Sequence, residues 1–206
     1  MKKNLFRVLS LAMAFLCLST AHAQDTKAVS IIPQPQKLEA KGGEYFLPEK
    51  VVIGYDGSFK AQAEYLQEML ARSTGRVAVL KEGKSKGSIV LQKDTVAVPV
   101  AEAYTLSVTP KCARIVASDA NGAFYGIQSL LQLFPAEIYS ASWQRNTEWK
   151  APCVEIYDAP ERPWRGLMMD VARYFYDKEF IKKTIDMMGM YKLNKLQFHL
   201  IDDSGW

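Results

Sequence analysis

The chain has 206 residues, with 26 basic and 22 acidic side chains, three cysteines and a formal net charge of +4. Hydrophobic residues make up 49% and charged residues 23%, an ordinary globular composition that excludes a disordered chain, a collagen-like repeat and a disulfide-rich scaffold. The length suits one or two domains but is too short for a complete (β/α)8 barrel, which typically needs about 250 residues.

Residues 1–23 have the three-part pattern of a secretory signal peptide. Basic side chains come first, at Lys2, Lys3 and Arg7. An apolar run over 8–18 follows, and Ala21-His22-Ala23 offers a cleavage site. The apolar run is too short to cross about 30 Å of hydrocarbon, which disfavours a transmembrane anchor. We therefore expect an exported protein, most simply periplasmic, with the outer surface or the medium as alternatives.

The signal peptide accounts for most of the net charge. It holds three of the 26 basic groups and no acidic group, which leaves 23 basic against 22 acidic side chains in residues 24–206. A nearly neutral mature chain gives no electrostatic case for nucleic acid or for an anionic membrane surface as a partner. Phe15 and Leu16 precede Cys17 where a lipoprotein signal needs small residues, so no lipid anchor is expected.

Two cysteines remain after the signal, Cys112 and Cys153. In an exported chain they could form one disulfide, and two buried thiols in strands are an equally good interpretation. Neither a CxxC motif nor a Cys/His cluster indicates a metal site.

The first half of the mature chain alternates short strands with two helices. Pro33 and Pro35 predict a stiff, extended segment within 29–40. Ser58 is expected to cap a helix that ends before Gly75. Short apolar runs bounded by glycine or proline predict strands over 51–53, 77–80, 88–91, 104–108, 113–117 and 154–157.

The clearest helix of this half is predicted over 120–134. Its apolar residues form one stripe, Asp119 can cap its start, and Pro135 prevents its continuation. Residues 136–152 have few periodic features and are expected to form a connecting loop.

The pattern changes after the proline-punctuated segment 158–163, the candidate domain boundary. Residues 165–171 are almost continuously apolar and predict a strand covered on both faces. Asp177 can cap a helix with apolar positions from Phe180 to Tyr191, and residues 195–200 then alternate as a strand. These three elements therefore predict one βαβ unit, with parallel strands and a right-handed crossover.

Polar residues gather at the C-terminal ends of these two strands, the edge where parallel α/β folds bind ligands. Arginine offers a planar donor fork, paired aspartates can accept from hydroxyls, and tryptophan can stack on a sugar ring. This chemistry suits a carbohydrate or another polar ligand. The candidate residues are Asp170, Arg173, His199, Asp202, Asp203 and Trp206.

Each candidate also has a structural interpretation. Asp170 and Arg173 could form a salt bridge, and His199 could be a satisfied core histidine. Asp202-Asp203 could be a helix N-cap and a solvated charge, and Trp206 could simply belong to the core. For each residue taken alone, the structural interpretation is the stronger one. Because all six residues are predicted at one edge of one sheet, a joint binding site becomes about as well supported as the structural interpretations. Strict alternation would place Asp170 and Arg173 on opposite faces, so the strand must end or bulge between them.

Several sequence blocks carry a family resemblance. They are residues 165–173 (RGLMMDVAR), 191–194 (YKLN) and 199–206 (HLIDDSGW) in the second half, and residues 32–36 (IPQPQ) and 122–130 (GAFYGIQSL) in the first half. The second-half blocks look like the opening of the catalytic domain of glycoside hydrolase family 20, the β-N-acetylhexosaminidases, and the first-half blocks are similar to the accessory α/β domain of that family. The resemblance covers essentially the whole mature chain.

This resemblance implies an enzyme that removes terminal N-acetylglucosamine or N-acetylgalactosamine from glycans with retention. The nucleophile would be the substrate's own 2-acetamido oxygen, so no cofactor or metal is expected. By the resemblance, Arg173 would hold sugar hydroxyls and Asp202 would belong to the polar network of the pocket. Asp170, His199, Asp203 and Trp206 would support that pocket.

The chain departs from the family pattern at three points. Tyr174 stands where family members often have histidine, and Ile201 and Ser204 stand where a Thr-Asp-Asp-Gln block usually has threonine and glutamine. The catalytic Asp–Glu pair of the family should lie well over a hundred residues beyond Trp206, so no catalytic residue is assigned in this chain.

The sequence therefore predicts an α/β fold with three segments: a signal peptide over 1–23, an accessory α/β sandwich domain over 24–155, and over 156–206 the first βαβ unit of a (β/α)8 TIM barrel. The leading hypothesis is a fragment of an exported β-N-acetylhexosaminidase, inactive alone. The alternative is a non-catalytic carbohydrate-binding or structural module derived from such an enzyme. An open reading frame that continues past codon 206 would favour the hypothesis of an enzyme fragment.

Overall fold

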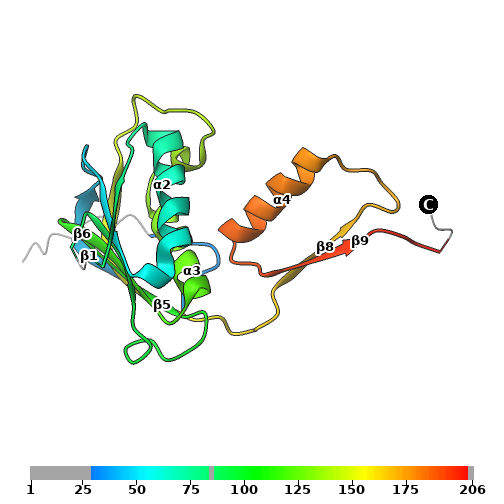
Figure 1. Cartoon of the computed structure of the whole chain (residues 1–206), viewed down its shortest axis with the longest axis horizontal. Coiled ribbons are helices and arrows are strands. Elements are labelled where there is room, and N and C mark those ends of the chain that lie inside the picture. The colour runs from blue at the N-terminus through cyan, green and yellow to red at the C-terminus, as the bar shows by residue number, and fades with distance from the viewer. Residues whose placement is uncertain (1–28, 84–85, 204–206) are drawn as a thin grey trace, which may run out of the picture.

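The computed structural model describes residues 29–83 and 86–203. The predicted signal peptide, residues 1–23, and the predicted pocket residue Trp206 lie outside the described residues. The chain forms a larger N-terminal lobe and a smaller C-terminal lobe, which are joined by residues 159–165 (Figure 1).

The N-terminal lobe is built on a mixed sheet. Its strands within the described residues are β1 (Lys37–Phe46), β2 (Val52–Tyr55), β3 (Val79–Glu82), β4 (Ile89–Lys93), β5 (Tyr104–Thr109), β6 (Cys112–Ala117) and β7 (Lys150–Asp158). Their order in the sheet is β1-β7-β5-β6-β4-β2-β3. The neighbours from β1 to β6 pair antiparallel, and those from β6 to β3 pair in parallel.

Helices α2 (Lys60–Thr74) and α3 (Ala120–Leu133) cover one face of this sheet (Figure 1). The apolar stripe of α3 places Ile127 and Leu130 in the core, where both are fully buried. Gly126 lets α3 approach the sheet closely, since a Cβ at this position would lie 2.6 Å from Cγ2 of Ile115 on β6. The close packing of α3 against the sheet explains why apolar residues recur so regularly over 120–134.

The helix caps confirm one prediction and correct another. Asp119 caps α3 as expected, since its Oδ1 accepts from the backbone N–H of Gly122 at 2.8 Å. Ser58 does not cap α2. A short 3-10 turn over Gly57–Phe59 precedes that helix, and Asp56 caps the turn by accepting from Ser58 N at 3.0 Å. The cap lies two residues earlier because the chain enters the helix through the 3-10 turn.

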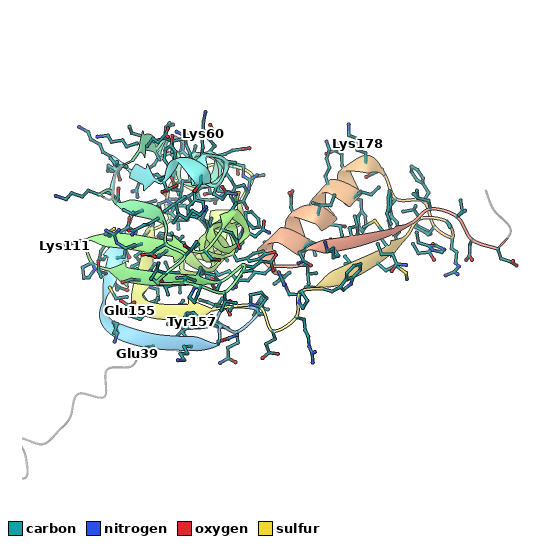
Figure 2. All side chains as sticks on the ribbon, turned by 60° about the horizontal axis from the view of Figure 1, so that its bottom comes forward. Glu39, Lys60, Lys111, Glu155, Tyr157 and Lys178 are labelled. Carbon is teal, nitrogen blue, oxygen red and sulfur yellow. The ribbon has the colours of Figure 1, made fainter. Side chains whose placement is uncertain are left out.

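Two stretches form more regular structure than their patterns predict. β1 extends to Phe46, past the predicted extended segment within 29–40, and it is an edge strand with an irregular register between Ala40 and Glu44. The predicted loop over 136–152 contains a 3-10 turn at Ala136–Tyr139, and β7 begins within it at Lys150. β1 and β7 lie side by side, and Figure 2 shows Glu39 and Glu155, which are register partners, on these two strands.

β7 also continues beyond the expected domain limit at 155. Tyr157 and Asp158 pair with Thr105 and Tyr104 of β5, so they belong to the N-terminal sheet. The proline-rich segment begins only after Asp158.

Both cysteines carry free thiols, so the disulfide interpretation is wrong. Cys112 lies on β6 and Cys153 on β7, and β5 runs between these two strands in the sheet. Cys153 is buried and Cys112 is half-buried, and burial raises the pKa of both thiols.

The C-terminal lobe is the predicted βαβ unit. It consists of β8 (Gly166–Asp170), α4 (Lys178–Met190) and β9 (Lys195–His199), and the two strands pair in parallel. Asp177 caps α4 as expected, accepting from Phe180 N at 2.8 Å.

The prediction that the first of these strands is covered on both faces is wrong for the described chain. Leu167 and Met168 of β8 are 39% and 56% exposed. The reason is that β8 and β9 form a two-stranded sheet within the described residues, with α4 as its neighbouring layer (Figure 2). Among the helices of the described chain, none combines the length and the apolar character needed to cross a membrane.

Candidate functional site

The predicted site residues that the structure describes gather where β8 and β9 end, on the side of the C-terminal lobe farthest from the N-terminal lobe (Figure 1). Parallel pairing puts Asp170, the last residue of β8, in register with His199, the last residue of β9. Val171 N donates to the carbonyl of His199 at 3.1 Å, which extends the ladder by one bond. The two strand ends are therefore held side by side.

The chain turns immediately after Asp170. The Oδ1 atom of Asp170 accepts from Ala172 N at 3.0 Å and from Arg173 N at 3.2 Å, a side-chain turn that aspartate commonly makes. This turn ends the strand and brings Arg173 back over Asp170, with 2.7 Å between Nη1 and Oδ2. The geometric condition set by the sequence, a strand end between the two residues, is met.

Arg173 joins the two strand ends. Its Nη2 atom forms an ion pair with Oδ2 of Asp202, which follows β9. Asp202 Oδ1 accepts from the backbone N–H of Asp203 at 2.8 Å. This N–H and, to a smaller extent, the guanidinium of Arg173 hold the pKa of Asp202 below its usual 3.8. The Asp202 carboxyl is therefore ionised at neutral pH and fixes the arginine.

The imidazole ring of His199 lies beside this group. Its Nε2 atom is 4.0 Å from Oδ2 of Asp202, and this atom is buried with no hydrogen-bond partner in the described part of the chain. This is not the arrangement of a satisfied core histidine. Asp203 is exposed at the rim.

The arrangement provides an exposed cation between two carboxylates. The Arg173 side chain is 67% exposed, and each of its two terminal nitrogens contacts one aspartate. A guanidinium has five N–H donors, so donors remain for a hydroxyl-bearing ligand. The structural salt bridge between Asp170 and Arg173 is present as well, so this interpretation and a binding role coexist.

The described residues hold no group of three or more His, Cys, Asp or Glu side chains that could bind a metal ion.

A second polar cluster lies between the two lobes, at the opposite ends of β8 and β9. The sequence patterns do not reveal it. It contains Arg165 and Lys192 from the C-terminal lobe and Glu102 and Asp158 from the N-terminal lobe. Lys192 directly follows an amphipathic helix, where a lysine ordinarily faces solvent and stabilises the helix dipole. The sequence offers only a weak signal: Arg165 opens the predicted strand over 165–171, and Lys192 lies between the predicted helix and the predicted strand over 195–200.

Comparisons with known proteins place both lobes in one family. Residues 28–159 match the model described as "Glycosyl hydrolase family 20, domain 2", and residues 163–206 match "Glycosyl hydrolase family 20, catalytic domain". The break between the two matched regions falls in the proline-rich segment that follows β7.

Individual relatives agree with the family models. A β-hexosaminidase of Porphyromonas gingivalis is 35% identical over 183 residues, which are 87% of this chain and 23% of that protein. An N,N'-diacetylchitobiase of Vibrio harveyi is 32% identical over 87% of this chain and 19% of its own length.

Among solved structures, the N-acetyl-β-hexosaminidase of Streptomyces plicatus in complex with Thio-NAglucal has a TM-score of 0.77 and 34% identity, covering 85% of this chain and 35% of that one. The present chain thus spans about a fifth to a third of the lengths of these relatives. Two matched domain models, sequence relatives and a shared fold together show that this chain belongs to glycosyl hydrolase family 20.

Proposed function

We propose that this chain is the N-terminal part of an exported β-N-acetylhexosaminidase that removes terminal N-acetylglucosamine or N-acetylgalactosamine from glycans. The observation that carries the proposal is the Asp170–Arg173–Asp202 group at the C-terminal edge of β8 and β9. Enzymes built on (β/α)8 barrels bind their substrates at this edge. The family membership and the names of the relatives, hexosaminidases and a chitobiase, agree with it.

In this proposal Arg173 binds hydroxyl groups of the terminal sugar. The carboxylates of Asp170 and Asp202 hold its guanidinium in place, so little side-chain freedom is lost when the sugar binds. His199 supports Asp202 from the side, and Asp203 lies at the rim of the pocket. Trp206, outside the described residues, is proposed as a further pocket residue from the sequence alone. The substrate's acetamido oxygen forms a bond to the anomeric carbon as the glycosidic C–O bond breaks, and a carboxylic acid expected later in the barrel gives its proton to the departing oxygen. Water then attacks the anomeric carbon, breaks the bond to the acetamido oxygen and gives its proton to the same carboxylate, so the sugar is released with retention.

The proposal is tested with the intact gene product and two chromogenic substrates. We expect 4-nitrophenol release from 4-nitrophenyl N-acetyl-β-glucosaminide and essentially none from 4-nitrophenyl β-glucoside, because the glucoside lacks the acetamido nucleophile. Equal turnover of both substrates would contradict the substrate-assisted mechanism, and no turnover of either would favour a non-catalytic module.

We further propose that residues 24–206 alone hydrolyse neither substrate, because the acid/base pair expected for the family is not among them. Purified 24–206 is assayed beside the intact protein under the same conditions. Release of 4-nitrophenol by 24–206 would show that this polypeptide carries its own catalytic groups.

A further inference from the structure

The junction between the two lobes contains two clusters of the same composition: a cation from the C-terminal lobe, and an acid and a tyrosine from the N-terminal lobe. In the first, Lys192 Nζ lies 2.8 Å from Asp158 Oδ2 and donates to the hydroxyl of Tyr104 at 2.8 Å. In the second, Arg165 Nη2 lies 2.9 Å from Glu102 Oε2 and donates to the hydroxyl of Tyr125 at 2.9 Å. Each cation also lies over the ring of its tyrosine, 5.0 and 5.2 Å from the ring centroid. We name these two clusters the junction clamp.

Lys192 is buried and the other three charged side chains of the clamp are partly buried, so the clamp is more enclosed than the exposed ion pair of Lys182 and Glu179. The Lys192 and Asp158 side chains are 6% and 13% exposed, and those of Arg165 and Glu102 are both 17% exposed. Removing one partner from such a pair leaves an uncompensated charge away from water, which is far more damaging than loss of an exposed pair. The two contacts therefore resist separation of the lobes.

The backbone is also distorted at the clamp. Among the described residues, the non-glycine residues with positive φ are Glu102 (φ 62) and Lys192 (φ 60), and both belong to it. Lys192 occupies the left-handed position at the end of α4, where Gly or Asn is favoured. Its N–H donates to Gly189 O and the next N–H, of Leu193, donates to Met188 O. A positive φ at a non-glycine residue costs conformational energy and persists only where the surrounding structure holds the residue in place.

The remainder of the junction is incompletely filled. A cavity of about 610 Å³ lies beside the clamp, bordered also by Pro33 and Trp164. The helices add a contact in which Phe124 of α3 lies near Gly189 of α4. Among the described residues, the ion pairs that join the two lobes are the two of the clamp.

The clamp acts where β8 and β9 begin. Arg165 immediately precedes β8, and Lys192 lies just before β9. The carbonyl of Arg165 also accepts from Asn194 N at 2.8 Å and from Lys195 N at 3.2 Å, and Arg165 Nε donates to Lys192 O at 2.8 Å. The two strand starts are tied to each other and to the N-terminal lobe, while their far ends carry Arg173 and Asp202.

We propose that the N-terminal lobe positions the sugar-binding edge: the junction clamp fixes the starts of β8 and β9, and these short strands transmit the constraint to Arg173 and Asp202. Glu102, Asp158, Arg165 and Lys192 are then positioning residues and not catalytic ones. The sugar-binding part of this inference rests on the proposed function, whereas the mechanical part does not.

The test uses Lys192→Gly and Glu102→Gly in the intact gene product, with amide hydrogen exchange as the readout. Glycine adopts a positive φ without steric cost, so it removes the backbone strain at both positions. If that strain were the only effect of the substitution, amide exchange would be unchanged or slower than in the unaltered protein. The clamp predicts exchange about tenfold faster or more at residues 192–195. It also predicts faster exchange at residues 171–173, whose N–H groups bond to His199 O and Asp170 at the far strand ends. Lys182→Ala, which breaks an exposed pair with Glu179, is the matched control and should change neither segment.

Unchanged exchange at residues 192–195 in both glycine variants would overturn the clamp. Faster exchange there with unchanged exchange at 171–173 would overturn the positioning role. If the glycine variants fail to fold, Glu102→Gln retains the shape of the side chain and removes its charge, and the same two segments decide. Because exchange needs no substrate, an intact protein without hexosaminidase activity would count against the proposed function and not against the clamp.

Discussion

At the scale of single residues, Arg173 is the side chain on which the binding proposal depends most. It is largely exposed, and its two ion pairs lie at the surface, where such pairs contribute little to stability. The same position makes it accessible to a ligand. Loss of function and loss of stability should therefore separate clearly at this residue.

We predict that Arg173→Ala in the intact protein lowers kcat/KM for the N-acetylglucosaminide roughly ten- to a hundredfold, as expected for losing charged hydrogen bonds to a substrate. The melting temperature should change by less than about 3 °C. Lys182→Ala, at the exposed Glu179 pair, is the control for both measurements. A large drop in melting temperature would favour the purely structural salt bridge.

Asp202 allows a prediction about pH. Its pKa is lowered first by the N–H of Asp203 and then by Arg173. Arg173→Ala should therefore raise the pKa of Asp202 only part of the way towards 3.8, as measured by NMR titration of the carboxyl carbon.

The sign of the linked stability follows from the depressed pKa. The contribution of the Asp202 contacts is fully present above the unfolded pKa and is lost as pH falls through the lower, folded value. The Arg173–Asp202 pair should therefore persist through mildly acidic pH. An Asp202 pKa at or above 3.8 in the unaltered protein would contradict this account.

At the scale of elements, the helix starts depend on single carboxylates. Asp119 serves two elements at once, since Oδ1 accepts from Gly122 N in α3 and Oδ2 accepts from Glu102 N at 2.8 Å before β5. Ser58 donates its hydroxyl to the exposed Asp56 and caps nothing. The two residues look alike in sequence as N-caps but differ in what they hold.

We predict that Asp119→Ala lowers the free energy of unfolding by about 1 kcal/mol or more, the usual cost of losing a cap. Ser58→Ala should cost less than about 0.5 kcal/mol. Denaturant unfolding of the two variants side by side measures the difference. Equal losses would mean that Ser58 contributes to the start of α2 after all.

At the scale of the whole molecule, the C-terminal lobe exposes much apolar surface. The large exposed apolar side chains of β8, α4 and β9 are Leu167, Met168, Phe180, Ile185, Met187 and Phe198. An apolar patch with unpaired strand edges beside it favours association with other chains. This surface contrasts with the N-terminal lobe, whose core is closed by α2 and α3.

We predict that residues 24–206, produced alone, are poorly soluble and self-associate at micromolar concentration, as seen by size-exclusion chromatography with light scattering. The intact gene product serves as the comparison. A monodisperse preparation of 24–206 that melts cooperatively would contradict the prediction and show that the exposed surface of the lobe is tolerated in water.

The sequence by itself determined the elements with strong periodicity and the gathering of polar residues at the far ends of β8 and β9. The α3 stripe and the β8–α4–β9 pattern are local signals, because burial of one face dictates the spacing of apolar residues. Asp170, Arg173 and Asp202 could be grouped because parallel strands end at the same edge. β1 could not be predicted, because a polar, glycine-containing edge strand is held by its partner β7 and not by its own composition.

Only the tertiary structure decided how Arg173 reaches Asp202 and where Lys192 and Glu102 lie. The Asp170 turn is set by the backbone geometry at the strand end, which a regular alternation pattern does not encode. The junction clamp joins residues as far apart in the chain as Glu102 and Arg165, and Tyr104 and Lys192. A charge that looks solvated beside its sequence neighbours is buried only once two distant segments meet, so its partner is a property of the fold.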